Sequence, residues 1–455
     1  MSIKTKLITS LGVAFASWLI ALPALAADEQ FGVTSVITVP GNPLASFDIE
    51  FVDPAAGVLL LADRSNKSID VINTSDNSIF KQLQPGFVGP LASGSPGCPA
   101  HMPPVPGANC GGPNGVLTVR HFPGKGRGRA LGLTEVWATD GGSKVWVLSL
   151  PSGKPVVPPI STALGAPGTD PNRADELCYD PDDGIILVAN PNSTPNGFVT
   201  STHNYKVLGH IVMDGTGGTP KASGGIEQCQ YSPRTGKFYI NVPRATAVPG
   251  FSTPQDLVLQ IDPVSETISN TLNLTQKSPT DGCVATPGGV RTAVGITGMA
   301  LGPNHQIAIA CGTTAPGSVV ITEDFGTIYS LVGEVGTDEI WYNPGDNHYF
   351  YATVLKGGAP PPTGQIILGV VDACGDSPPP CVPQVDTVAT PTPPGVTPVV
   401  PAIGNKAAAD PVANQVYVPV NPTNAPLSKI CSSHGGDDTK GCIAVFTTTS
   451  DDPGE

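Results

Sequence analysis

The sequence predicts a single β-propeller with seven blades of four antiparallel strands each. A motif in which a short apolar strand runs into a proline turn recurs seven times along the chain. Short β-branched runs fill most of the remaining sequence, and 54 Gly and 50 Pro punctuate them, as expected for many strands joined by turns. A spare strand also precedes the first copy of the motif, where a closed ring of blades needs one.

The first 26 residues are predicted to be a secretory signal peptide outside the fold. Lys4 and Lys6 precede an apolar run over Leu7–Leu22, and Ala24-Leu25-Ala26 is typical of a cleavage site. A membrane anchor is the alternative, but the run falls short of the ~20 residues that span a bilayer. We therefore expect cleavage after Ala26, a propeller domain over 27–455, no membrane span in the mature protein, and a periplasmic or secreted location.

The repeated motif sets the spacing of the blades. Its copies end at Pro54, Pro123 (a looser copy), Pro181, Pro233, Pro303, Pro344 and Pro411. The mean step is about 60 residues, longer than the about 40–50 of common propeller repeats, so long insertions are predicted. The expected insertions are Ser93–Gly112, Val242–Thr253, Lys356–Thr363 and Pro422–Gly441.

A second strand follows every copy of the motif except the looser one, and further strands complete the blades. Second strands are predicted at Val58–Ala62, Ile185–Ala189, Lys237–Val242, Gln306–Ala310, His348–Ala352 and Gln415–Val418. Third strands are predicted at Ser68–Ile72, Lys144–Leu148, Leu257–Ile261 and Ile443–Thr447, and fourth strands follow polar turns. The last repeat runs out of chain after its third strand, so Phe31–Val39 is expected to close it and remove an open edge. Two stacked β-sandwiches are the alternative that one recurring pattern disfavours.

Ten cysteines in an exported chain indicate disulfides. Three pairs are close in sequence and are expected to staple loops: Cys98–Cys110, Cys374–Cys381 and Cys431–Cys442. The remaining Cys178, Cys229, Cys283 and Cys311 allow three pairings, which the sequence leaves open. A zinc site around Cys98, His101 and Cys110 is a competing interpretation, although no C-x-x-C pair supports it.

The charge of the chain bears on its partners. The formal net charge is −14, and removal of Lys4 and Lys6 with the leader makes it −16. An acidic surface repels phosphate backbones, so nucleic acid is excluded as an expected partner, whereas cations and neutral molecules are compatible. We expect a monomer.

The candidate site lies where the innermost strands converge on the channel. The residue six before each motif proline is polar in most copies: Asp48, Asp175, Glu227, Thr297, Asp338 and Asn405, with Asn114 near the looser copy. Like charges about 8 Å apart repel by roughly 2 kcal/mol at an effective dielectric near 20, so a cation such as Ca²⁺ would relieve them. A metal site at Asp48, Asn114, Asp175, Glu227, Asp338 and Asn405 is one hypothesis, and capping of the strands is the other. The next residues, Glu176, Gln228 and Glu339, are expected to bridge blades.

Two segments carry a family resemblance. Leu59–Asn73 and Val136–Val147 resemble the repeats of YVTN and NHL-type bacterial propellers, in which a strand, a small residue with Asp, a polar turn and an alternating strand follow one another. Pro113-Asn114-Gly115 is similar to the metal-binding motif of gluconolactonase-like calcium propellers. That likeness implies Asn114 as a calcium ligand, with Asp48 or Glu50 and Asp281 as its companions, although Asn114 and Asp281 lie much farther apart than in that family.

These observations leave three hypotheses for function. The first is an exported propeller that binds a small molecule, a cation or a protein partner at the channel mouth or rim loops. The second is a calcium-dependent hydrolase or lactonase that uses the channel carboxylates. The third is a structural surface-interaction module, suggested by the Pro/Thr-rich stretch Pro380–Pro401. No G-x-S-x-G, H-E-x-x-H or dinucleotide-binding motif occurs, so no catalytic residue is assigned.

Overall fold

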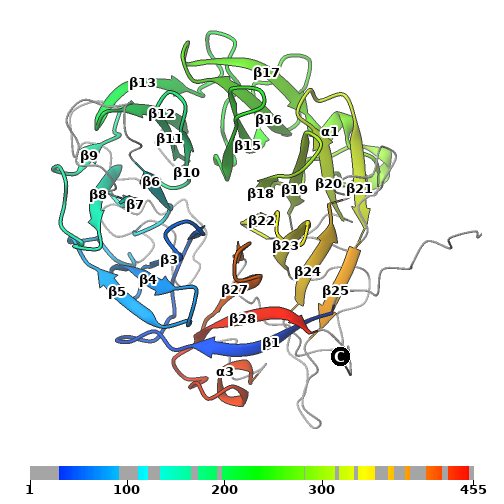
Figure 1. Ribbon diagram of the computed structural model, residues 1–455. Helices are drawn as coiled ribbons and strands as arrows, with labels where there is room; N and C mark the ends of the chain where they lie inside the picture. The colour runs from blue at the N-terminus through cyan, green and yellow to red at the C-terminus, as the bar shows by residue number, and fades with distance from the viewer. Residues whose placement is uncertain are drawn as a thin grey trace, which may run out of the picture.

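A computed structural model shows a ring of seven four-stranded antiparallel sheets, which confirms the predicted seven-bladed β-propeller (Figure 1). The structure describes residues 30–91, 111–120, 134–164, 173–191, 197–280, 282–312, 317–332, 337–353, 367–373, 385–389, 406–422 and 429–449. The predicted signal peptide lies outside these residues, as do Cys98, Cys110, Cys374, Cys381, the insertion Lys356–Thr363 and most of Ser93–Gly112. Within them, no helix has the length and apolar character needed to cross a membrane.

Each blade runs from an innermost to an outermost strand. Blade 1 contains β2 (Glu50–Asp53), β3 (Val58–Asp63), β4 (Ser68–Asn73) and β5 (Ile79–Leu83). Blade 2 contains β6 (Val116–Arg120), β7 (Thr134–Asp140), β8 (Lys144–Leu150) and β9 (Ile160–Ser161). Blade 3 contains β10 (Leu177–Asp180), β11 (Ile185–Asn190), β12 (Phe198–His203) and β13 (Lys206–Val212). Blade 4 contains β14 (Cys229–Ser232), β15 (Lys237–Ala245), β16 (Gln255–Asp262) and β17 (Thr267–Asn273).

The remaining blades follow the same order. Blade 5 contains β18 (Ile296–Leu301), β19 (Gln306–Cys311), β20 (Gly317–Thr322) and β21 (Ile328–Val332). Blade 6 contains β22 (Ile340–Asn343), β23 (His348–Thr353), β24 (Ile367–Asp372) and β25 (Val385–Ala389). Blade 7 contains β26 (Ala408–Asp410), β27 (Gln415–Val420), β28 (Cys442–Thr449) and β1 (Gln30–Ile37). Short helices α1 (Leu274–Lys277) and α3 (Ile430–Ser433) and the 3₁₀ turn Pro287–Gly289 lie in connecting segments.

The two ends of the described chain close the ring. β1 pairs with β28 from Gln30 opposite Thr449 to Ile37 opposite Ile443, so the most N-terminal strand is the outer strand of the last blade (Figure 1). This pairing confirms the closure predicted from the spare strand at Phe31–Val39. It gives blade 7 its fourth, outermost strand and ties the first and last described segments of the ring by main-chain hydrogen bonds.

The proline turn between the first two strands explains why the motif recurs. In blade 1, the Asp53 carboxylate accepts hydrogen bonds from the backbone N–H groups of Ala55 and Ala56, at 3.1 and 3.0 Å. The turn ends at a position with positive φ, which is Gly57 here. The equivalent positions are Gly184, Gly236, Asn347 and Asn414, all with positive φ. Gly and Asn tolerate this conformation best, so the turn demands the pattern Asp/Asn/Ser-Pro-x-x-Gly/Asn.

Three disulfides lie within the described residues, and these include no free cysteine. Cys431–Cys442 confirms one predicted loop staple. Of the three open pairings, the structure has Cys178–Cys229 and Cys283–Cys311. Cys178–Cys229 joins the inner strands β10 and β14, so it fixes blade 3 to blade 4 beside the channel. Disulfides persist in oxidising compartments, which is consistent with an extracellular or periplasmic protein.

The Cys178–Cys229 disulfide is expected to stabilise the fold more than the Cys431–Cys442 staple. It closes a sequence separation of 51 residues against 11, which corresponds to about 4 and about 3 kcal/mol in the chain-entropy model. Equilibrium urea denaturation of the two double Cys→Ala variants measures both values. A larger loss from removal of Cys431–Cys442 would contradict this ranking.

Candidate functional site

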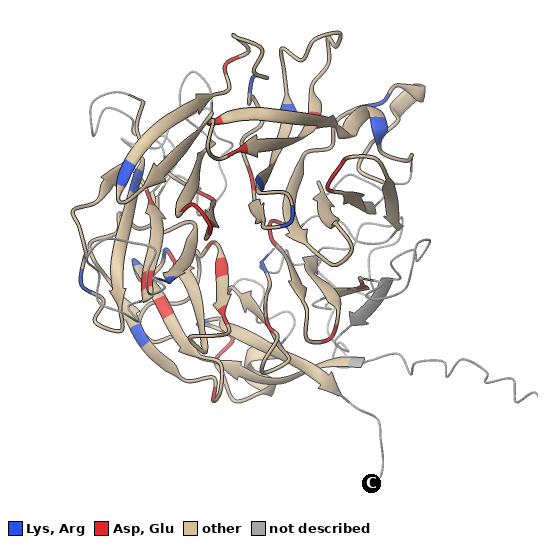
Figure 2. Cartoon of the chain, turned by 45° about the horizontal axis from the view of Figure 1, so that its top comes forward, with Lys and Arg blue, Asp and Glu red and all other residues tan. Residues whose placement is uncertain are grey.

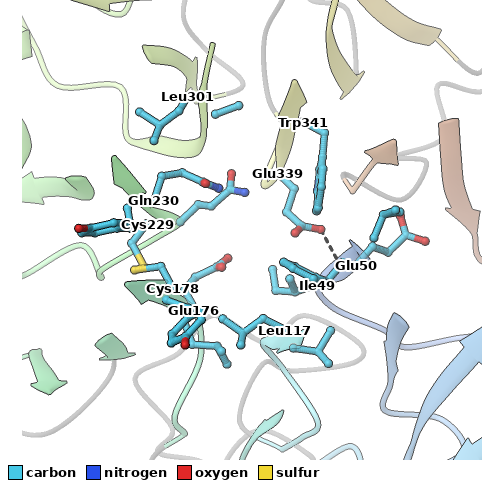
Figure 3. Close-up of a pocket in the computed structure, with 18 of the residues that line it drawn as sticks. Ile49, Glu50, Leu117, Glu176, Cys178, Cys229, Gln230, Leu301, Glu339 and Trp341 are labelled. Carbon is cyan, nitrogen blue, oxygen red and sulfur yellow. Dashed lines mark hydrogen bonds between the residues drawn. A yellow bond between two sulfur atoms is a disulfide. The ribbon is translucent and has the colours of Figure 1, made fainter. Parts of the chain in front are cut away.

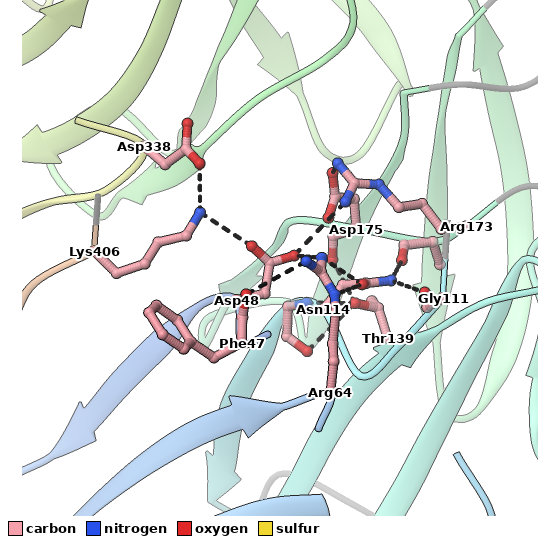
Figure 4. Close-up of polar contacts among 12 residues, drawn as sticks. Phe47, Asp48, Arg64, Gly111, Asn114, Thr139, Arg173, Asp175, Asp338 and Lys406 are labelled. Atoms are coloured by element: carbon pink, nitrogen blue, oxygen red, sulfur yellow. Dashed lines mark hydrogen bonds and ion pairs between the residues drawn. The ribbon is translucent and has the colours of Figure 1, made fainter. Parts of the chain in front are cut away.

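Three of the predicted site carboxylates meet at one end of the channel, just before the inner strands begin. Asp48, Asp175 and Asp338 precede β2, β10 and β22 and lie in one polar network (Figure 4). Charged segments of both signs surround the centre of the ring (Figure 2). We call this set the mouth network, and it comprises the carboxylates Asp48, Asp175 and Asp338 and the cations Arg64, Arg173 and Lys406.

Asp48 is the hub of the mouth network because all three cations contact it. Arg64 donates to its Oδ2 atom, the Lys406 ammonium lies 3.0 Å from Oδ1, and Arg173 Nη1 lies 3.7 Å from Oδ2. Lys406 also donates to Asp338 at 2.7 Å, and Arg173 pairs with Asp175. These contacts join blades 1, 3, 6 and 7 across the end of the channel.

The ion pairs set the protonation of the buried groups. Burial alone would raise the pKa of Asp48, but Arg64, Lys406 and Arg173 together hold it at about 2. Burial opposes the charge on Lys406 as well, yet Asp338 and Asp48 raise its pKa above the usual value. For Asp175, burial outweighs the attraction of Arg173 and raises the pKa to about 6. Asp48 and Lys406 are therefore a firmly ionised pair.

Asn114 lies at this end of the channel, where its side chain binds Arg64 in place of the predicted calcium ion. Its amide oxygen accepts hydrogen bonds from Nε and Nη2 of Arg64, at 2.9 and 2.7 Å. Its amide nitrogen donates to the carbonyl oxygens of Gly111 and Ala174, at 2.9 and 2.7 Å. All the hydrogen-bonding positions of the buried Asn114 amide are used by the chain itself.

The other predicted metal ligands lie apart from these ion pairs. Glu227 precedes β14, and burial together with repulsion from Asp338 and Asp175 raises its pKa to about 8. Glu50, the alternative ligand, is completely buried, and neither of its carboxyl oxygens has a hydrogen-bond partner. Asn405 and Asp281 lie outside the described residues. The structure thus brings together Asp48, Asn114, Asp175 and Asp338, with Glu227 close enough to interact electrostatically.

The cations Arg64, Arg173 and Lys406 are site residues that were not predicted from the sequence. Arg173 and Asp175 are two apart in an extended segment, so their side chains share a face, and this spacing could have identified the pair. Lys406 directly follows the proposed ligand Asn405, but nothing local indicates that it reaches across to blades 1 and 6. These three side chains supply at the mouth the positive charge that was expected from Ca²⁺.

A second layer of polar side chains comes from the next residue along the chain in each of three blades, directly before the inner strand begins. Gln228 Oε1 accepts hydrogen bonds from the backbone N–H groups of Met299 and Ile340, at 2.5 and 3.2 Å. Glu339 Oε2 accepts one from the N–H of Glu50 at 2.9 Å. The predicted bridging of blades is confirmed for these two residues. Glu176 has no such bond, and its carboxyl group points into the channel (Figure 3).

A cavity of about 400 Å³ begins at this layer and extends toward the proline turns. Three glutamates line it, and we call Glu50, Glu176 and Glu339 the glutamate layer. Six blades line it, and its aromatic side chains are Phe51, Tyr179, Tyr231, Trp341 and Tyr342 (Figure 3). Phe51 and Trp341 meet edge to face with ring centroids 5.6 Å apart. Among the described residues that line the cavity, none is Lys, Arg or His.

Burial is the largest cause of altered protonation in this layer. It raises the pKa of Glu50, Glu176 and Glu339 well above the usual value, and repulsion from Glu339 adds to the effect at Glu50 and Glu176. Lys406 lowers the pKa of all three, but not enough to offset burial. The mouth network is therefore charged and balanced, whereas the glutamate layer favours neutral carboxyl groups.

Comparisons with known proteins add one structural likeness. No protein-family model matches the sequence, and no curated protein matches it. A chain in the crystal structure of a mitotic checkpoint complex is similar in structure, with 11% identity and a TM-score of 0.49. The match covers 98% of this chain and 99% of that one.

Substitution of Lys406 by Met is expected to destabilise the fold strongly. It leaves Asp48 and Asp338 without their shared cation, and removal of one partner from a buried ion pair costs about 3–5 kcal/mol. Thermal and urea denaturation measure the loss, with Lys206→Met on the exposed start of β13 as the control. Equal stability of the two variants would show that the mouth network does not hold the ring.

Calcium binding at the mouth stays a prediction. Within the described residues, no three His, Cys, Asp or Glu side chains are arranged to hold a metal ion. A calcium ion at Asp48 would compete with Lys406, so Lys406→Met should bind Ca²⁺ more tightly than the unmodified protein. Calorimetric titration with Ca²⁺ measures both affinities, and no binding to either protein would contradict the prediction.

Proposed function

We propose that this propeller is a binding protein that takes a small organic molecule into the channel cavity. The observation that carries the proposal is the cavity of about 400 Å³, enclosed by the inner strands of six blades. Small-molecule sites have volumes of about 300–1,000 Å³ and mostly apolar walls with a few converging polar groups. Apolar and aromatic walls with Glu176 and Glu339 at one end fit this description.

The arrangement of the channel supports entry from one side. The mouth network occupies the end where the inner strands begin, and its central pair is nearly buried, with Lys406 4% and Asp48 9% exposed, whereas Asp338 at its rim is 33% exposed. The cavity wall continues along the strands to Pro181 and Pro233, in the turns at the opposite end. A ligand would therefore enter between the proline turns and meet the glutamate layer last.

The other hypotheses have weaker support. A calcium-dependent hydrolase or lactonase at the mouth would need free oxygen ligands, but the Asn114 oxygen accepts two hydrogen bonds and Asp48 contacts three cations. A protein partner at the rim loops or a surface-interaction role remains compatible with the propeller fold. Pro380–Pro401, which suggested the surface role, lies largely outside the described residues.

A cavity-filling substitution tests the proposed site. Leu301 lines the cavity at the end of β18, and Leu301→Trp should occupy part of it and weaken ligand binding at least tenfold. Leu208→Trp on the outer strand β13 is the matched control, since Leu208 is 49% exposed and outside the cavity lining.

The probes are small aromatic and aliphatic compounds that include cations, neutral molecules and anions. Thermal shift followed by calorimetry should find at least one that binds with a Kd below about 1 mM, a free energy of about −4 kcal/mol. The proposed function would be overturned if no cationic, neutral or anionic compound binds, or if Leu301→Trp binds the compound as tightly as the unmodified protein does.

A further inference from the structure

The distribution of charge along the channel bears on the class of ligand that the cavity would accept. In the mouth network, three carboxylates are matched by three cations of the chain. Beneath it, the cavity is lined by Glu50, Glu176 and Glu339, and the described residues of the cavity wall include no basic side chain. We infer that the cavity binds an organic cation, an amine with an apolar body, whose ammonium group pairs with the carboxylate of Glu176.

Glu176 is the residue that points most directly to a ligand. It is 5% exposed, and among the described residues no hydrogen bond or ion pair reaches its carboxyl group. Buried polar groups normally have partners, so an unpartnered carboxyl group in a cavity wall calls for one from outside the chain. The side chain points into the cavity (Figure 3), where a bound molecule can reach it.

The charged groups around Glu176 favour a cation over an anion. Glu339, Asp175 and Asp48 repel a negative charge on Glu176 and, after burial, raise its pKa. Lys406 acts in the opposite sense on Glu176, and it is already shared by Asp48 and Asp338. A second cation beside Glu176 and Glu339 would stabilise the ionised carboxylate, whereas an anion would add to the repulsion.

The walls favour an organic cation over a metal ion. Calcium requires six to eight oxygen ligands, but Gln228 Oε1 already accepts two backbone hydrogen bonds and Glu339 Oε2 accepts one. The rest of the wall includes Phe51 and Trp341. Aromatic faces attract ammonium groups and bury the hydrocarbon attached to them.

This inference rests on the proposed function and narrows it to one class of ligand. It also fixes the sign of the pH dependence. Burial keeps Glu176 protonated above the usual pKa of a glutamate, so pairing with an ammonium group must release that proton. Amine affinity should therefore rise with pH, by up to about tenfold per unit, until Glu176 is ionised in the free protein.

The test compares three molecules of similar shape and different charge: 2-phenylethylamine, 2-phenylethanol and phenylacetate. Calorimetry between pH 5 and pH 8 should show that the amine binds at least tenfold more tightly than the alcohol at pH 8. It should also show rising amine affinity with pH and no binding of phenylacetate. Titration in two buffers of different ionisation enthalpy should count about one proton released per amine bound.

Two variants complete the experiment. Glu176→Gln, nearly equal in shape, should weaken amine binding at least tenfold and remove its pH dependence. The control Glu266→Gln, in the turn between β16 and β17, should change neither. Tighter binding of the alcohol, blocked by Leu301→Trp, would overturn the inference and leave the proposed function standing. Amine binding that ignores Glu176→Gln, or no amine binding at all, would also overturn the inference.

Discussion

The buried contact of Lys406 with Asp48 and Asp338 is the constraint on which the centre of the molecule depends. Lys406 lies in blade 7, yet its ammonium group joins carboxylates of blades 1 and 6. The inner strand of blade 7 is only three residues long and begins with two alanines, so blades 1 and 6 approach each other past it. The hydrogen bond from Glu50 N–H to Glu339 and the edge-to-face contact of Phe51 with Trp341 bridge the same two blades.

The ring is therefore closed at two places, by main-chain hydrogen bonds at one and by ion pairs at the other. The pairing of β1 with β28 closes the outer edge with main-chain hydrogen bonds. Lys406 closes the inner edge with ion pairs that must be complete, because a buried charge without a partner costs several kcal/mol. This requirement separates the channel into a balanced ionic mouth and a glutamate layer in which burial raises the pKa of each carboxyl group. This separation is the basis of the proposed preference of the cavity for a cation.

The sequence was sufficient for the architecture because the blade motif is local. The Asp53 cap, the proline and Gly57 specify the same turn that recurs around the ring, and the strand at Phe31–Val39 had no role other than closure. The candidate site was predictable only in part. The repeat placed Asp48, Asp175 and Asp338 together, but the partners that neutralise them come from different positions in each blade. Lys406 reaches two other blades, and neither that reach nor the free carboxyl group of Glu176 is a local property of the sequence.

The most direct test of this charge distribution is to measure the pKa values of the channel carboxyl groups by ¹³C NMR titration, with Gln and Asn variants used to assign the signals. If the mouth is balanced, Asp48 should stay ionised down to about pH 2. Because burial raises their pKa values, Glu176 and Glu339 should keep their protons well above pH 4.5. Titration of all three near the values of exposed Asp and Glu would contradict both the balanced mouth and the neutral glutamate layer.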